Sequence, residues 1–134
     1  VPVQSLSLDS AYTFLVNDGT ANGSARYSSS GALVYVQTTT TLQLDLTNLG
    51  FGSVDIVRWD PTSGASSSIA TGVSTAGQTA YILSGQGTNS IGSTDWIFEF
   101  IFTPSSPLTV HGGILAVAGG GTLSIMTNTG VIAV

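Results

Sequence analysis

The chain has 134 residues, with seven acidic side chains, two arginines, no lysine and no cysteine. Two cations cannot neutralise a run of phosphates, so the composition excludes binding to the nucleic-acid backbone or to anionic membrane surfaces. Without cysteine there is neither a disulfide framework nor a thiolate-bound zinc ion. The net charge is −5 and the charged share is 7%, against roughly 25% in ordinary soluble domains, which predicts a surface built mainly from uncharged polar residues.

Such a surface is typical of secreted proteins, and also of subunits whose faces are covered by neighbouring copies. The chain starts at Val1 without a charged leader, so we expect that a signal peptide or upstream segment has been removed and that the protein is secreted or extracellular. No stretch reaches the ~18 apolar residues of a membrane span, so no membrane insertion is expected. Asn22 begins the sequon Asn22-Gly23-Ser24 and is a candidate glycosylation site.

The segments between turn residues are short and have a period near two, which predicts strands and no helix. In chain order the predicted strands are Leu6–Leu8, Ala11–Val16, Ala32–Val36, Thr41–Leu46, Val54–Trp59, Ser67–Ala70, Ala80–Leu83, Trp96–Phe102, Leu108–Val110, Ile114–Val117, Leu123–Met126 and Val131–Val134. Strands spaced roughly 8–12 residues apart predict an all-β fold. We expect an antiparallel β-sandwich, jelly-roll-like in type, or a barrel, with about ten short strands over residues 1–134.

The two most regular segments are Val54–Trp59 and Trp96–Phe102. They show which residues face the core, because successive side chains of a strand point to opposite sides. The predicted core row of the second segment is Trp96, Phe98, Phe100 and Phe102. Glu99 then lies on the opposite face, where it needs a partner or water. Arg58 is the candidate partner for Glu99 or Asp95, as a structural ion pair inside the sandwich.

The middle of the chain carries a recognisable pattern. It comprises Tyr35-Val36, Leu44-Asp45-Leu46, the turn Trp59-Asp60-Pro61-Thr62-Ser63-Gly64, and the strand that starts at Asp95-Trp96. This pattern resembles the collagen-binding domain found C-terminal to apiosidase-like glycoside hydrolases, over residues 25–102. The family has Trp at the position of Arg58 and often a basic residue at that of Thr62. The resemblance implies an immunoglobulin-like sandwich that binds carbohydrate or extracellular matrix.

Two interpretations of the turn stay open. Pro61 sets the first corner, Asp60 can cap turn amides and Gly64 can take a left-handed conformation, which is an architectural role. Alternatively, Trp59 and Asp60 contact a ligand. The tyrosines Tyr12, Tyr27, Tyr35 and Tyr81 are further candidates, since their amphipathic rings can stack on a sugar. Of these we take Tyr35 and Tyr81, with Trp59 and Asp60, as the predicted ligand-binding residues.

The sequence predicts no catalytic residue, no metal site and no cofactor. His111 is the only histidine and no Gly-x-Ser-x-Gly elbow is present, so a Ser–His nucleophile is not expected. The carboxylates Asp55, Asp60, Asp95 and Glu99 each have a structural interpretation, which disfavours a glycosidase pair. Asp18, Thr20 and Asn22 alternate like calcium ligands, but Ser29 stands where an acidic closing ligand is needed.

Two functions from different classes remain. The first is a non-catalytic secreted binding module for polysaccharide or matrix protein, as an accessory domain of a glycoside hydrolase. The second is a structural subunit of an extracellular filament, surface layer or coat, joined by β-strand addition. It is favoured by the positive mean hydropathy and by residues 107–134, whose apolar strands alternate with glycines and could form a self-associating edge.

Overall fold

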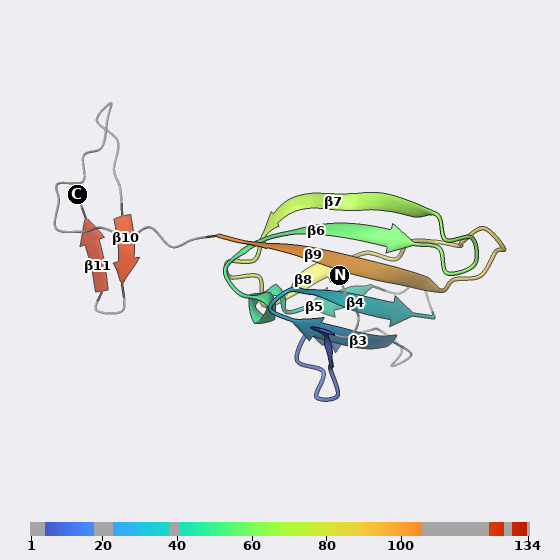
Figure 1. Ribbon diagram of the computed structural model, residues 1–134, viewed down its shortest axis with the longest axis horizontal. Helices are drawn as coiled ribbons and strands as arrows, with labels where there is room; N and C mark the ends of the chain where they lie inside the picture. The colour runs from blue at the N-terminus through green and yellow to red at the C-terminus, as the bar shows by residue number, and fades with distance from the viewer. Residues whose placement is uncertain (1–4, 18–22, 38–40, 106–123, 128–129, 134) are drawn as a thin grey trace, which may run out of the picture.

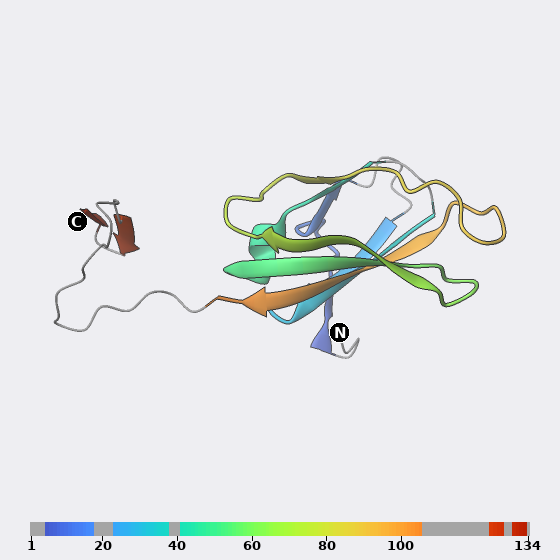
Figure 2. The ribbon, with the colours of Figure 1, turned by 90° about the horizontal axis from the view of Figure 1, so that it is seen from above.

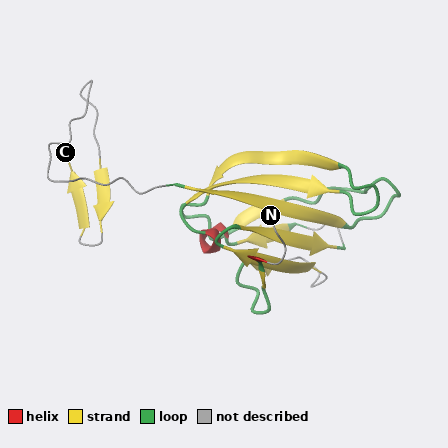
Figure 3. Cartoon of the chain, in the orientation of Figure 1, coloured by secondary structure: helices red, strands yellow, loops and turns green. Residues whose placement is uncertain are grey.

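The computed structural model describes residues 5–17, 23–37, 41–105, 124–127 and 130–133 (Figure 1). Its strands are β1 (Ser7–Leu8), β2 (Leu15–Asn17), β3 (Gly23–Ser28), β4 (Gly31–Val36), β5 (Leu42–Leu44), β6 (Gly52–Trp59), β7 (Ser66–Ser74), β8 (Tyr81–Leu83), β9 (Trp96–Pro104), β10 (Ser124–Thr127) and β11 (Gly130–Ala133). A 3-10 turn, η2 (Leu46–Leu49), follows β5 (Figure 3). Within the described ranges, no helix is long and apolar enough to cross a bilayer.

The strands form an antiparallel sandwich. A six-stranded sheet has the order β1-β3-β4-β9-β6-β7, and a three-stranded sheet has the order β2-β5-β8 (Figures 1 and 2). Every strand pair in both sheets is antiparallel. The predicted all-β sandwich of about ten strands is therefore confirmed, with eleven strands in the described part of the chain.

The core lies between the two sheets and follows the alternation of side chains. Strand β9 buries Trp96, Phe98 and Phe100, with exposures of 6%, 2% and 0%, and Phe102 packs half-buried against them. The predicted aromatic core row is thereby confirmed. The larger sheet adds Ala25, Ala32, Val34, Val36, Val54 and Ile56, and the smaller sheet adds Leu15, Leu42, Leu44 and Leu83.

Two parts of the first third differ from the prediction. Strand β3 has no counterpart among the predicted strands, because its sequence lacks clear alternation of polar and apolar residues; it forms by pairing with both β1 and β4. The segment predicted as one strand, Ala11–Val16, is a strand only from Leu15. The carboxylate of Asp9 accepts hydrogen bonds from the amides of Thr13, Phe14 and Leu15, so a capped loop replaces the expected ladder.

The C-terminal strands β10 and β11 form a hairpin that pairs with itself. Ile125 lies opposite Ile132 and Met126 opposite Val131. Among the described strands, neither member of this hairpin is paired with a strand of the sandwich (Figure 1). The predicted strands Leu108–Val110 and Ile114–Val117 lie outside the described residues. The expectation that a single sandwich domain spans residues 1–134 therefore stays a prediction for the C-terminal part of the chain.

Candidate functional site

The outer face of the six-stranded sheet brings together two of the predicted ligand-binding residues. Tyr35 of β4 and Trp59 of β6 are both register partners of Ile97, which lies on β9 between them. Neighbouring strands are about 4.8 Å apart, so the two aromatic residues are anchored about 10 Å apart on one line. We call this line the aromatic row; it consists of Tyr35, Ile97 and Trp59. All three are partly exposed.

Each aromatic side chain of the row is held by a carboxylate. Trp59 Nε1 donates to Glu99 Oε1 at 3.1 Å. The Tyr35 side chain is a hydrogen-bond partner of the Asp95 carboxylate. Because these bonds restrict the ring orientations before any ligand arrives, the row loses less conformational entropy on binding than free side chains would.

The Asp95 carboxylate is itself fixed by a loop that precedes β9. Asn89 Nδ2 donates to Asp95 Oδ1 at 2.9 Å, and the Ser93 hydroxyl donates to the same oxygen. The hydrogen bond from Ser93 is the main cause that lowers the pKa of Asp95, with further contributions from the Asp95 amide, Asn89 and Tyr35, against the opposing effect of burial. Asp95 therefore stays ionised, and its loop holds the carboxylate in place.

The Asp60 carboxylate is bonded to the backbone of its turn, as the architectural interpretation expects. Asp60 is 6% exposed. Its carboxylate accepts hydrogen bonds from the backbone amides of Thr62 at 2.8 Å, Ser63 at 3.2 Å and Ser90 at 2.9 Å. Gly64 closes the turn with φ of 74° and donates its amide to the Asp60 carbonyl at 2.9 Å. Both Asp60 oxygens therefore hold backbone, and the turn supports one wall of the site.

Two shallow hollows lie along the aromatic row. The Trp59 hollow is lined by Leu33, Trp59, Pro61, Gly64, Ile97 and Glu99, and by Asp60 at its wall. The central hollow is lined by Leu8, Ser24, Arg26, Leu33, Tyr35 and Ile97, with Ala25 beneath. They share Leu33 and Ile97, so they adjoin. Aromatic rings beside carboxylates suit a ligand with an apolar face and hydroxyl edges.

The predicted ion pair of Arg58 is corrected by the strand register. Arg58 is the partner of Phe98, so it lies on the core face of the sheet, whereas Glu99 lies on the outer face. The Arg58 guanidinium stacks over Trp96, 4.2 Å from the ring centroid, and donates to Gln86 Oε1 at 3.3 Å. A cation–π contact with Trp96 replaces the expected pairing with Glu99 or Asp95.

Other predicted site residues do not join the row. Tyr81 lies on β8 in the smaller sheet, where it packs half-buried against the core. The glycosylation candidate Asn22 lies outside the described residues, as do Asp18, Thr20 and His111. Within the described part, no three His, Asp or Glu side chains gather in a way that could hold a metal ion. Ile97 and Leu33 were missed as site residues, although alternation with the core row places Ile97 on the outer face.

The buried Asp60 makes stability depend on pH in a defined direction. The Ser90 hydroxyl is the main cause that lowers the pKa of Asp60, and the amides of Ser90, Thr62 and Ser63 add to it, outweighing burial. A carboxyl whose pKa is lower in the folded state stabilises the fold above its unfolded pKa of about 3.9, and loses that contribution as the pH falls toward the folded value. Asp60→Asn should therefore be less stable than the native chain at pH 7, by a margin that shrinks below about pH 4.

Urea unfolding of both proteins from pH 7 to pH 2 measures this margin. The other acidic residues are common to both proteins, so their effects cancel in the difference. A margin that stays constant over the whole range would contradict the assigned role of the Asp60 charge.

Comparison with known proteins adds no identification. No protein-family model matches the chain, and no curated protein matches it in sequence. The resemblance to the collagen-binding domain therefore rests on the motifs from Tyr35 to Asp95-Trp96 alone.

Proposed function

We propose that the chain is a non-catalytic binding module of a secreted protein, and that it recognises carbohydrate or an extracellular matrix protein through the outer face of its six-stranded sheet. The observation that carries this proposal is the aromatic row, with Trp59 held by Glu99 and Tyr35 by Asp95. Partly exposed aromatic rings in fixed orientations are typical anchors of recognition surfaces.

The charge of the chain supports a neutral ligand. With two arginines in the sequence, the protein lacks the cations that an anionic polymer requires. Of these, Arg58 is stacked on Trp96, and the exposed Arg26 is one of the residues that line the central hollow. The binding face therefore offers aromatic rings and carboxylates with one positive charge.

The carboxylates support binding rather than hydrolysis. A glycosidase needs two carboxyl groups free to act on the scissile bond. Asp60 holds turn and loop amides, Asp95 holds Asn89, Ser93 and Tyr35, and Glu99 accepts from Trp59. These groups are engaged in positioning the backbone and the rings of the face.

The sheet edges favour a binding module over assembly by strand addition. In the described sandwich, the edge strands β1, β2 and β8 have only two, three and three residues. The fourth edge, β7, has nine residues, but its pairing with β6 shifts register at two points. Short and bulged edges are how sheets avoid pairing with another chain. The motif resemblance supports the further proposal that the module accompanies a glycoside hydrolase.

The test is binding of the purified domain to a panel of neutral polysaccharides and to immobilised collagen, with Trp59→Ala as the variant. We expect loss of a Trp anchor to weaken binding at least about tenfold. Ile82→Ala is the matched control, because Ile82 is 53% exposed on the smaller sheet, away from the aromatic row. Circular dichroism and thermal unfolding verify that both variants fold. Equal binding by the native chain and folded Trp59→Ala would overturn the proposal.

A further inference from the structure

We infer that the ligand is an extended neutral glycan, that its chain runs across the strands from Trp59 to the loop before β2, and that Tyr12 forms a further sugar subsite at that end. This inference rests on the proposed function and specifies its ligand. It follows from a third hollow, from the backbone of Tyr12, and from the balance of donors and acceptors along the face.

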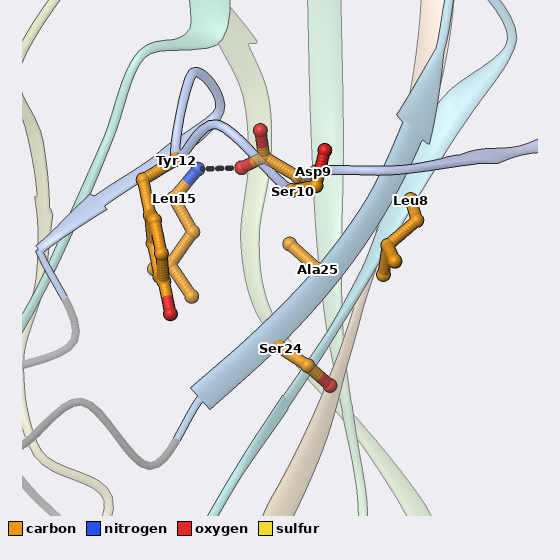
Figure 4. Close-up of a pocket in the computed structure, with 7 residues that line it drawn as sticks. All are labelled: Leu8, Asp9, Ser10, Tyr12, Leu15, Ser24 and Ala25. Carbon is orange, nitrogen blue, oxygen red and sulfur yellow. Dashed lines mark hydrogen bonds between the residues drawn. The ribbon is translucent and has the colours of Figure 1, made fainter.

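The third hollow, the Tyr12 hollow, lies at the β1 edge of the sheet. Its lining includes Leu8, Ser10, Tyr12, Leu15, Ser24 and Ala25 (Figure 4). In Figure 4 the Tyr12 side chain stands on one side and Leu8 on the other, with Ser24 and Ala25 of β3 between them. Tyr12 is 53% exposed and Leu8 is 57% exposed. Two large apolar side chains thus form open walls over a small-residue floor.

The loop holds Tyr12 in a conformation that disfavours every residue with a side chain. Its φ is +53°, the positive value of the left-handed region, and no other non-glycine residue of the described chain has a positive φ. Asp9 determines this conformation by accepting from the amides of Thr13 at 2.7 Å, Phe14 at 3.0 Å and Leu15 at 2.8 Å. Burial of the ring does not explain the strain, since Tyr12 is exposed. Strain of this kind is concentrated at functional positions.

The three hollows adjoin one another. The Tyr12 hollow and the central hollow share Leu8 and Ser24, while the central hollow and the Trp59 hollow share Leu33 and Ile97. The resulting trough crosses β1, β3, β4, β9 and β6, which are successive neighbours in the sheet. Four strand spacings give it a length of about 19 Å. A ligand that fills the trough is therefore an extended chain rather than a single sugar.

The hydrogen-bonding groups distinguish a glycan from a collagen-like peptide. Aromatic grooves that bind polyproline helices dock segments that are rich in proline and so have few N–H donors, which leaves the groove to supply the donors. Here the Trp59 N–H donates to Glu99, and the Tyr35 side chain is bonded to Asp95. The Trp59 end of the trough thus presents a carboxylate acceptor beside the indole ring, and its middle presents the Tyr35 ring with Arg26 and Ser24 in the lining. Sugar hydroxyls supply donors, and sugar C–H faces stack on rings.

The experiment compares ligands of different length with two variants of Tyr12. Isothermal titration uses di- and hexasaccharides of cello-, xylo- and manno-oligosaccharide series, together with a triple-helical collagen peptide. Tyr12→Gly removes the ring and adopts the positive φ without strain, so the loop stays folded. Tyr12→Phe keeps the ring. We expect the best hexasaccharide to bind more tightly than its disaccharide, and Tyr12→Gly to weaken the hexasaccharide about tenfold while Tyr12→Phe does not.

The outcomes separate this inference from the proposed function. Trp59→Ala should weaken both lengths, whereas Tyr12→Gly should weaken only the longer one. Hexasaccharide binding that depends on Trp59 but is unchanged in Tyr12→Gly overturns the extended site and leaves the proposed function standing. Trp59-dependent binding of the collagen peptide alone overturns the glycan assignment. Absence of binding to every probe overturns the proposed function together with the inference.

Discussion

Replacement of Phe100 by alanine should lower the free energy of unfolding by about 3–5 kcal/mol, the range for large aromatic residues removed from a core. Phe100 is fully buried, and its ring meets the ring of Phe14, the residue before β2, edge-on, with centroids 5.3 Å apart and an interplanar angle of 87°. Its register partners on the neighbouring strands are Ala32 and Ile56. Ala32 is too small to fill the resulting cavity, so the loss of packing should persist.

Urea or guanidinium unfolding, followed by tryptophan fluorescence, measures the effect of Phe100→Ala. Ile101→Ala is the matched control, because Ile101 is the next residue of β9 and is 40% exposed on the opposite face. Its cost should stay below about 1 kcal/mol, as for ordinary surface substitutions. Equal effects of the two substitutions would contradict the assignment of the core face of β9.

The second large effect is expected at Asp9, whose carboxylate holds the loop that presents Tyr12. Asp9→Ala should destabilise the fold by about 3 kcal/mol or more, because it leaves buried amide donors without their charged acceptor. The amides of Phe14 and Leu15 are both in buried positions, where water cannot replace the carboxylate. Since the same bonds determine the backbone of Tyr12, the variant should also lose the length-dependent part of ligand binding.

Chemical unfolding and hexasaccharide titration together test the role of Asp9. Ser10→Ala serves as the control, since Ser10 is the adjacent exposed residue and its loss should cost within about 0.5 kcal/mol. Asp9→Asn keeps the shape but loses the charge, and should fall between the two. Native stability of Asp9→Ala would show that the loop does not depend on the carboxylate.

Four carboxylates of the described chain accept hydrogen bonds from N–H and O–H donors. Asp9 and Asp60 hold backbone amides, Asp95 holds side chains of its loop, and Glu99 holds the indole of Trp59. Hydrogen bonds to an ionised carboxylate are stronger than those between neutral groups. In a protein with two arginines, these carboxylates order loops and rings through such hydrogen bonds.

Features set by short-range alternation could be predicted from the sequence. The core row of β9 and the turn from Asp60 to Gly64 follow from a period of two and from turn-forming residues. These features require only that neighbouring residues point to opposite sides and that the chain reverses at a proline and a glycine. No knowledge of which strands become neighbours is needed.

Features that depend on strand order and register were decided by the tertiary structure. Strand β3 has little pattern of its own and exists because β1 and β4 flank it. Tyr35 and Trp59 meet only because β9 lies between β4 and β6, and Arg58 faces Trp96 rather than Glu99 because of its register with Phe98. Pairing of distant segments depends on the packing of the whole core, since a shift by one residue would exchange the two faces of a strand. Alternation therefore indicated which side chains point away from the core, while only the assembled sheet determined which of them lie together in a site.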